Sequence, residues 1–372
     1  RAQGMYRPTD WLTLRSTWGT TFRAPNLREQ FLGGQISFGS AFADPCVAST
    51  FNGLDPADQA RVRNNCTLQG ADVDNLGLGG ATSIPIASGG FADLDAETSE
   101  SISAGIVFEQ PWYDSFDFRF AVNYFSIEIE DSIEEPTLGL ILNACLIEST
   151  DLNSPFCALI ERNTSSDPTR NFISQINSGF VNVGLIETDG VDFNIGFNTD
   201  FTLFGSQADL SFNGVATYIA SNRRDIFADQ DTAPAESFRG EYGYPLWQGN
   251  WTTRLDWRDL SATWTGRYIG EWSDDDIDPI RTQDFADQTT GFVYFAAGFR
   301  DVEEADAKIY HDLSVSYDMD VWNFVVGARN VFDERPPLVD SGEGIPETAN
   351  NVIGMGYDIY GRTWFTGVRR SF

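Results

Sequence analysis

His311 is the only histidine of the chain, and this limits the catalysis that the sequence could support. A Ser-His-Asp triad would have to use it as the general base. In the segment "IYHDLSVSY", His311 shares the alternate positions of Leu313 and Val315. We therefore expect His311 on an apolar, outward face of a strand, and we predict that the protein is not an enzyme.

The four cysteines form two local pairs, Cys46 with Cys66 and Cys145 with Cys157. Each pair lies in a stretch rich in Gly, Pro, Asn and Asp, with no neighbouring histidine to complete a zinc site. We predict two disulfides that each staple one loop, which requires an oxidising compartment. The alternative is four unrelated thiols.

The run "SDDDIDP" places four carboxylates in one short segment, at Asp274, Asp275, Asp276 and Asp278. Carboxylate oxygens are ligands that Ca²⁺ prefers, but the run lacks the glycine and the closing glutamate of an EF-hand. A solvated acidic loop is the favoured interpretation, and a calcium site is the alternative. We predict no resident metal and no cofactor.

Binding is the chemistry that the remaining residues favour. Aromatic side chains beside carboxylates and amides suit sugars, which they bind by stacking and by hydrogen bonds to hydroxyl groups. An alternative is that the aromatic side chains pack the loops together. The candidate ligand contacts are loop residues of these kinds: Phe38, Phe42, Trp272, Asp274, Phe292, Tyr294 and Phe295.

The charge of the chain narrows the class of partner. There are 24 Lys and Arg against 55 Asp and Glu, which gives a formal net charge of −31. Such a field repels polyanions, so nucleic acid is excluded as a partner. An acidic surface also disfavours anionic ferric siderophores and favours a neutral ligand, such as an oligosaccharide.

The framework that holds these loops shows a period of two. In "WQGNWTTRLDW", Trp247, Trp251 and Leu255 share one face, and polar residues occupy the other. The pattern restarts in "LSATWTGRY" after residues 258–259, which predicts a hairpin with one apolar and one polar face. Ten segments are expected to form strands of this kind: 11–22, 99–108, 116–130, 180–198, 207–219, 245–257, 260–270, 308–317, 322–331 and 362–372.

The connections between these strands alternate in length. The short ones are "QPWYD", "NTDFTLFG", "RD" and "DMDV", whereas the long ones are 23–93, 131–179, 220–243, 271–307 and 332–361. No apolar run reaches the ~20 residues of a membrane helix. Short turns at one end and long loops at the other predict an antiparallel transmembrane β-barrel. A soluble β-sandwich also alternates, but aromatic residues near the strand ends favour the barrel.

One strand carries an irregular pattern. Alternate positions from Phe116 to Tyr124 are apolar, and then Phe125, Ile127 and Ile129 take the opposite parity. This change predicts either a β-bulge or the passage of the strand out of the membrane.

Five stretches, in order along the chain, resemble segments of the TonB-dependent receptors, the active transporters of the Gram-negative outer membrane. They are "STWGTTFRAPNLREQF", "DLDAETSESISAGIVFEQP", "GLIETDGVDFNI", "GARNVFDERPP" and "YDIYGRTWFTGVRRSF". Two positions depart from the family pattern: Ala96 replaces a usual proline, and Arg370 stands where an apolar residue is commoner. A cation near the end of a lipid-facing strand costs only ~0–1 kcal/mol.

The resemblance implies a 22-stranded barrel, of which residues 1–372 are a C-terminal portion with about ten strands. The plug domain and the N-terminal box that contacts TonB are not found in this sequence. Implied partners are outer-membrane lipid, the TonB complex through the missing N-terminal part, and a scarce nutrient. That nutrient is a neutral oligosaccharide or a ligand of the siderophore or cobalamin type. The alternatives are a passive outer-membrane porin and a soluble β-sandwich adhesin.

Overall fold

The computed structural model describes residues 1–77, 83–164, 171–182, 184–225, 236–273, 304–339, 347–348 and 351–371. Its main element is one large antiparallel sheet, in which each strand pairs with the next one of the sheet along the chain. The short β13 (Glu236–Ser237) pairs with the end of β12. The other strands, in order across the sheet, are β1 (Ala2–Thr9), β2 (Leu12–Arg23), β5 (Glu97–Glu109), β6 (Phe116–Glu130), β11 (Leu185–Leu203), β12 (Ser206–Asp225), β14 (Trp247–Trp257), β15 (Leu260–Ile269), β18 (Lys308–Met319), β19 (Trp322–Arg329) and β22 (Thr363–Arg370).

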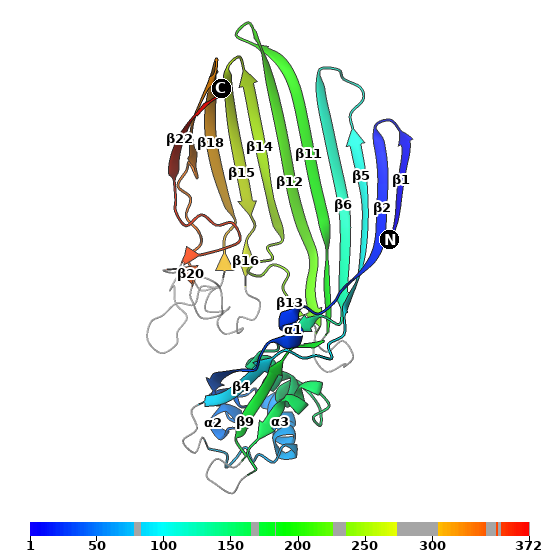
Figure 1. Ribbon diagram of the computed structural model, residues 1–372, viewed down its shortest axis with the longest axis vertical. Coiled ribbons are helices and arrows are strands. Elements are labelled where there is room, and N and C mark those ends of the chain that lie inside the picture. The colour runs from blue at the N-terminus through cyan, green and yellow to red at the C-terminus, as the bar shows by residue number, and fades with distance from the viewer. Residues whose placement is uncertain are drawn as a thin grey trace.

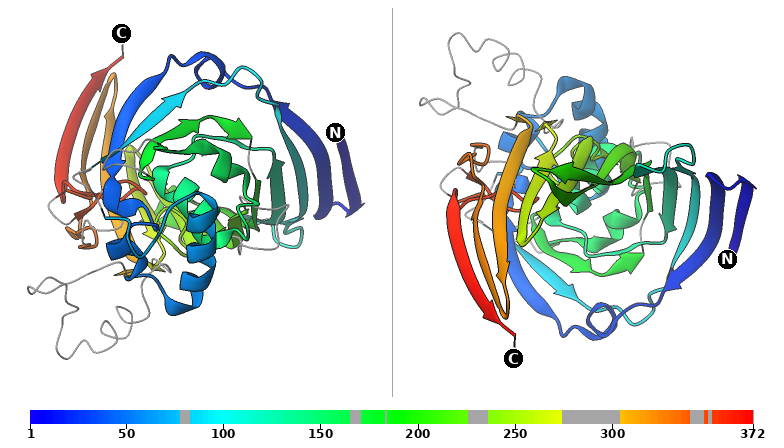
Figure 2. Two further views of the ribbon diagram at one scale, coloured as in Figure 1. Left: turned by 90° about the horizontal axis from the view of Figure 1, so that it is seen from below. Right: turned by 90° about the horizontal axis from the view of Figure 1, so that it is seen from above.

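The sheet curls into an open arc of a barrel (Figure 2). Within the described residues, β1 and β22 each have one neighbouring strand and lie at opposite ends of the arc. The prediction of an antiparallel β structure with about ten barrel strands is confirmed. One further strand, β1, comes from the segment before the first predicted strand.

The two faces of the sheet differ as the alternation predicts. Ladder partners on the outer face are apolar and exposed, for example Trp18 opposite Ile102 and Val315 opposite Val326. Other exposed apolar residues of this face are Leu14, Ile106, Ile195, Trp264, Leu313, Phe324, Trp364 and Val368. The opposite face carries Arg15, Arg119, Asp192 and Asp209. The apolar belt therefore lies on the outside of the arc.

Short turns join the strands at one end of the arc (Figure 1). Between β11 and β12 the turn consists of Phe204 and Gly205, whose φ angles are 46° and 78°. Two successive positive φ angles define a type I′ turn, and glycine at the second position adopts this conformation at no steric cost. The prediction of a longer turn over 198–205 is therefore wrong, because β11 continues to Leu203.

Of the two interpretations of the parity change in β6, the β-bulge is contradicted. Pairing of β6 with both β5 and β11 runs without a register shift. The irregularity lies one strand further on, where Asp189 pairs with Ser221 and Gly190 with Ile219. Because β6 stays regular, its outer face changes from apolar residues to Glu128 and Glu130 near the end with the long connections.

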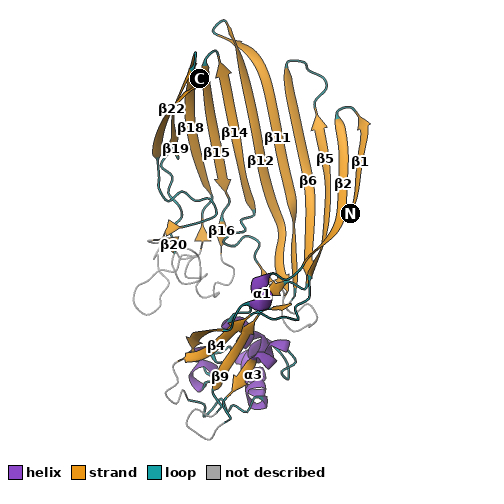
Figure 3. Cartoon of the chain, viewed as in Figure 1, coloured by secondary structure: helices purple, strands orange, loops and turns teal. Residues whose placement is uncertain are grey.

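The first two long connections fold together into a compact unit, which we call the loop module (described residues of 24–96 and 131–182; Figures 1 and 3). Its sheet has the order β3 (Gln35–Ser40), β4 (Ser83–Gly89), β9 (Ile173–Gly179) and β8 (Ile160–Arg162), with β4 and β9 parallel. Its helices and helical turns are α1 (Leu27–Phe31), η1 (Ala41–Ala43), α2 (Ala48–Phe51), α3 (Pro56–Leu68), α4 (Leu138–Leu142), the π-helical η2 (Asn143–Glu148) and η3 (Pro155–Leu159). The sequence pattern identifies these connections only as long loops.

The module has its own apolar core. Phe156, Ile141, Leu146, Ile176 and Val62 are almost fully buried there. Both predicted disulfides are confirmed, Cys46–Cys66 and Cys145–Cys157.

Three two-stranded pairs complete the described elements: β7 (Ile133–Glu134) with β10 (Val181–Asn182), β16 (Trp272–Ser273) with β17 (Glu304–Ala305), and β20 (Glu347–Thr348) with β21 (Asn351–Val352). Among the described helices, none has the length and apolarity needed to cross a membrane.

Candidate functional site

Arg23, the last residue of β2, joins the sheet to the loop module. Its guanidinium donates two hydrogen bonds to the Glu97 carboxylate, at 2.5 and 2.7 Å, and bonds to both carboxylate oxygens of Glu29, at 2.9 and 3.0 Å. The Glu29 side chain is only 9% exposed. Charge-assisted, two-pronged bonds of this kind fix the position of a chain as well as its orientation.

The sequence around Arg23 forms a helix start directly after the strand. Asn26 accepts hydrogen bonds from the backbone N–H groups of Arg28 and Glu29, and the Glu29 carboxylate accepts one from the Asn26 N–H. This reciprocal capping box begins α1. The segment "FRAPNLRE" therefore acts as a structural joint, with Glu29 serving both the helix and Arg23.

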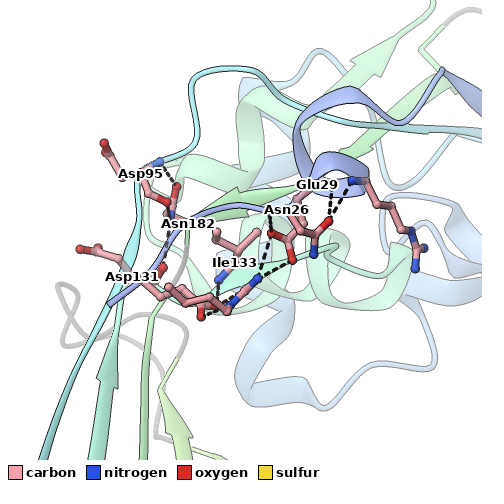
Figure 4. Close-up of polar contacts among 9 residues, drawn as sticks. Asn26, Glu29, Asp95, Asp131, Ile133 and Asn182 are labelled. Atoms are coloured by element: carbon pink, nitrogen blue, oxygen red, sulfur yellow. Dashed lines mark hydrogen bonds and ion pairs between the residues drawn. The ribbon is translucent and has the colours of Figure 1, made fainter. Parts of the chain in front are cut away.

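The second connection is tied to the same joint. The Ile133 N–H donates to Glu97 Oε1 at 2.7 Å. The Asn182 amide donates to the backbone oxygens of Asp95 and Asp131 at 3.0 and 2.9 Å, and its Oδ1 accepts from the Asp95 N–H at 2.9 Å. Figure 4 shows these contacts lying side by side. The ends of β2, β5 and β6 thus hold both connections of the module in one arrangement.

Two more of the recognised stretches meet at a second joint. The Asn330 side chain bonds to the backbone O and N–H of Glu334, both at 2.8 Å. Asp333 Oδ1 accepts from the Arg362 N–H at 2.8 Å. A Cβ added to Gly361 would lie 2.7 Å from Asp333 Oδ1, and the φ of Gly361 is +71°, so only glycine fits there without strain.

A buried ion pair connects the two halves of the loop module. Arg162, on β8, contacts Asp44 at 2.8 Å, with exposures of only 5% and 3% for the two side chains. Arg162 also donates to Gln69 Oε1 at 2.7 Å and contacts Cys46 Sγ at 3.1 Å. Because Asp44 and Gln69 belong to the first connection and Arg162 to the second, the pair links them inside the core.

The predicted ligand contacts fall into three groups. Phe38 on β3 and Phe42 on η1 are exposed on the loop module, at 68% and 56%. Trp272 is 3% exposed and belongs to a different cluster. The remaining four, Asp274, Phe292, Tyr294 and Phe295, lie outside the described residues, as does the acidic run that could hold Ca²⁺.

Trp272 is buried and packs against other aromatic side chains. Its ring lies edge-on to Tyr242, and its indole N–H donates to the Tyr357 hydroxyl at 2.9 Å. The Tyr242 hydroxyl in turn donates to the backbone oxygen of Ile353 at 2.6 Å. Burial raises the pKa of Tyr357, because an apolar environment disfavours the phenolate. This cluster joins the long connection 220–243, which carries Tyr242, to the long connection 332–361, which carries Tyr357.

A cleft of about 560 Å³ lies between the loop module and the end of β12. Its wall includes Pro45, Leu140 and Leu142 from the module and the Glu135 carboxylate. Arg224 of β12 also lines it and pairs with Glu134 at 3.1 Å. This volume is within the range of small-molecule sites, and its mixed lining suits a ligand with apolar and hydroxyl groups.

The inner face of the arc is a polar wall. Arg15 donates to Asn123 Oδ1 at 2.9 and 2.6 Å, across the intervening strand β5. Gly105 makes this contact possible, because a Cβ at that position would lie 2.1 Å from Asn123 Oδ1. On the next strands, Thr217 donates to Asp192 at 2.7 Å. Wide barrels carry such polar side chains on the lumen side.

Two residues of special interest lie on the outer face. His311 stacks on Trp264 with ring centroids 5.7 Å apart and accepts the Trp264 indole N–H at 3.1 Å. Its outward position is therefore confirmed. Arg370 lies over the Trp322 ring, with its guanidinium carbon 5.2 Å from the centroid. A cation on an aromatic ring near a strand end is well accommodated, and this explains the departure from the family pattern.

A curled antiparallel sheet with an apolar outer belt, a polar inner wall and long connections at one end defines an outer-membrane β-barrel. The chain matches the family model "TonB dependent receptor-like, beta-barrel" over residues 1–331. It therefore belongs to the TonB-dependent receptor family, whose members lie in the outer membrane of Gram-negative bacteria.

Solved structures of this family share the fold. A ferric enterobactin receptor (PfeA) mutant from Pseudomonas aeruginosa superposes with a TM-score of 0.53 at 16% identity, covering 100% of this chain and 39% of that chain. The siderophore receptor PirA from Acinetobacter baumannii gives 0.52 at 13% identity, covering 99% and 40%. The chain thus spans about 40% of the length of these receptors. No curated protein matches the sequence.

Sequence reasoning missed the Arg23 joint and the buried pair of Arg162 with Asp44. The joint carried a signal, since Asn26 followed three residues later by Glu29 is the pattern of a capping box. The start of helix α3 also carried a sequence signal, because Asp55 followed by Pro56 is a standard helix start. The Arg162–Asp44 ion pair carried no such signal in the sequence, because 118 residues separate the two side chains.

Proposed function

We propose that this chain is the C-terminal barrel portion of an active transporter that imports a scarce nutrient across the outer membrane. The loop module and the neighbouring cleft receive the nutrient at the cell surface, and the polar wall lines its path. The energy comes from the TonB complex, which acts through the N-terminal part of the receptor. The transporter has no catalytic role. The observation that supports this proposal is the joint at Arg23, which fixes a folded module at the ends of three barrel strands.

Two substrate classes are candidates. The net charge of −31 favours a neutral oligosaccharide, because the acidic surface repels anions. The second class is an iron chelate, since solved structures with this fold include receptors named for ferric enterobactin and siderophores. Exposed Phe38 and Phe42 serve as ligand contacts in either case, by stacking against rings.

Uptake by a Gram-negative host that expresses the whole receptor tests the proposal. We expect radiolabelled nutrient to accumulate in cells with functional TonB and to stay outside cells that lack it. A passive porin would give equal uptake in both strains and ion conductance in planar bilayers. A soluble adhesin would be extracted from cells without detergent. Either result would overturn the assignment.

A further inference from the structure

The small sheet of the loop module has one covered and one open face. Ile86 and Ile176 point into the core, where Ile176 is fully buried. On the opposite face Phe38 and Ile36 are exposed at 68% and 66%. In Figures 1 and 3, β4 and β9 lie in front of α2 and α3, so these helices back the covered face.

Strand register places four side chains in a row across the open face. Phe38 pairs with Pro85, and Gln175 pairs with Glu161. The parallel pairing of Ile86 with Ile176 brings Gln175 level with Pro85. Adjacent strands lie about 4.8 Å apart, so the row spans roughly 14 Å. An aromatic ring stands at one end of the row, and an amide and a carboxylate stand at the other.

The polar end of the row is held in place by its own hydrogen bonds. Gln175 Nε2 donates to Asn177 Oδ1 at 2.6 Å, and Asn177 Nδ2 donates to Glu161 Oε1 at 2.9 Å. Among the described residues, none donates to Gln175 Oε1 or Glu161 Oε2. These two acceptors are therefore available to a ligand and already oriented, which lowers the entropy cost of binding.

We propose that this face, with the row Phe38–Pro85–Gln175–Glu161, is a binding platform for a neutral oligosaccharide. A sugar ring stacks on Phe38, and the hydroxyl groups of the next ring donate to Gln175 and Glu161. Charge favours this occupant over an anionic one, since the described part of the module carries fourteen Asp and Glu against four Arg. The inference deepens the proposed function, because it gives the substrate class and a site for it.

Binding to the whole chain in detergent micelles tests the platform by calorimetry. The probes are maltohexaose, cellohexaose and xylohexaose, with tetragalacturonate as the anionic counterpart. We expect at least one neutral probe to bind with a Kd below 1 mM, and Phe38→Ala to weaken it about tenfold. Phe38→Trp retains binding and so shows that the strand still folds. Glu161→Gln weakens binding severalfold. Leu68→Ala is the matched control, because Leu68 is 56% exposed at the end of α3.

The platform is refuted if no neutral probe binds, if Phe38→Ala and Glu161→Gln leave the affinity unchanged, or if tetragalacturonate binds equally well. Saturable binding of a cationic peptide to this face, with no binding of a sugar, would also overturn the platform proposal. The two proposals fail separately. Sugar binding without TonB-dependent uptake leaves the platform standing and removes the transporter function. Uptake of a sugar that persists in Phe38→Ala leaves the transporter standing and removes the platform.

Discussion

Replacing Arg23 by Gln should loosen the joint between the loop module and the barrel without unfolding either. The change removes four charge-assisted hydrogen bonds and leaves the Glu29 carboxylate, 9% exposed, and the Glu97 carboxylate, 15% exposed, without their cation. Bonds to charged groups contribute about 1.5–3 kcal/mol each when buried. The Arg23 side chain is 44% exposed, so solvent screening reduces this contribution, and we expect a total loss of about 2 kcal/mol.

A loss of about 2 kcal/mol raises the population of the opened joint roughly 30-fold. Hydrogen exchange read by mass spectrometry in micelles measures it, because local opening exposes backbone amides. Peptides covering 26–32 and 131–136 should exchange faster by this factor, whereas peptides of β11 and β12 stay unchanged. Arg15→Gln is the matched control, since Arg15 bonds to Asn123 on the inner wall away from the joint. Equal exchange at the joint in wild type and Arg23→Gln would refute the reasoning.

Two further changes probe the wall and the module. Gly105→Ala should lower the free energy of unfolding of the barrel by about 1–3 kcal/mol, because the new Cβ displaces the Asn123 side chain. Chemical unfolding measures this loss. Gly4→Ala is the control, because a Cβ at Gly4 has no other atom within 4 Å. Arg162→Leu should destabilise the module by about 3–5 kcal/mol, because Asp44 stays buried without its cation. Limited proteolysis should then cut within the module while the barrel resists, and Asp44→Asn in the same chain should restore part of the resistance.

The strands could be predicted because their information is local. The alternation of apolar and polar residues assigns Trp251 to the apolar face without any knowledge of the neighbouring strands. The hairpin turn at 258–259 follows because the alternation stops there and begins again at Leu260. The parity change in β6 left a bulge and a change of environment open, because parity alone does not distinguish them. Glu128 and Glu130 show that β6 leaves the apolar belt while its ladder stays regular.

The loop module could not be predicted because its contacts are distant in sequence. The core brings Val62 against residues near 145, and Arg162 reaches Asp44 across 118 residues. The candidate ligand contacts were named from residue type alone, and their role stays a prediction. Phe38 is exposed on the module. The burial of Trp272 could not be predicted, because it depends on contacts with Tyr242 and Tyr357, which are distant in sequence.

The parallel pairing of β4 with β9 makes the module depend on both of its connections. The Cys46–Cys66 bond closes a segment of the first connection alone and can form as soon as that connection has emerged. That connection cannot complete the sheet alone, because β9 belongs to the second connection, beyond β5 and β6 in the chain. A chain that ended within β6 would therefore carry the first disulfide but no finished module sheet.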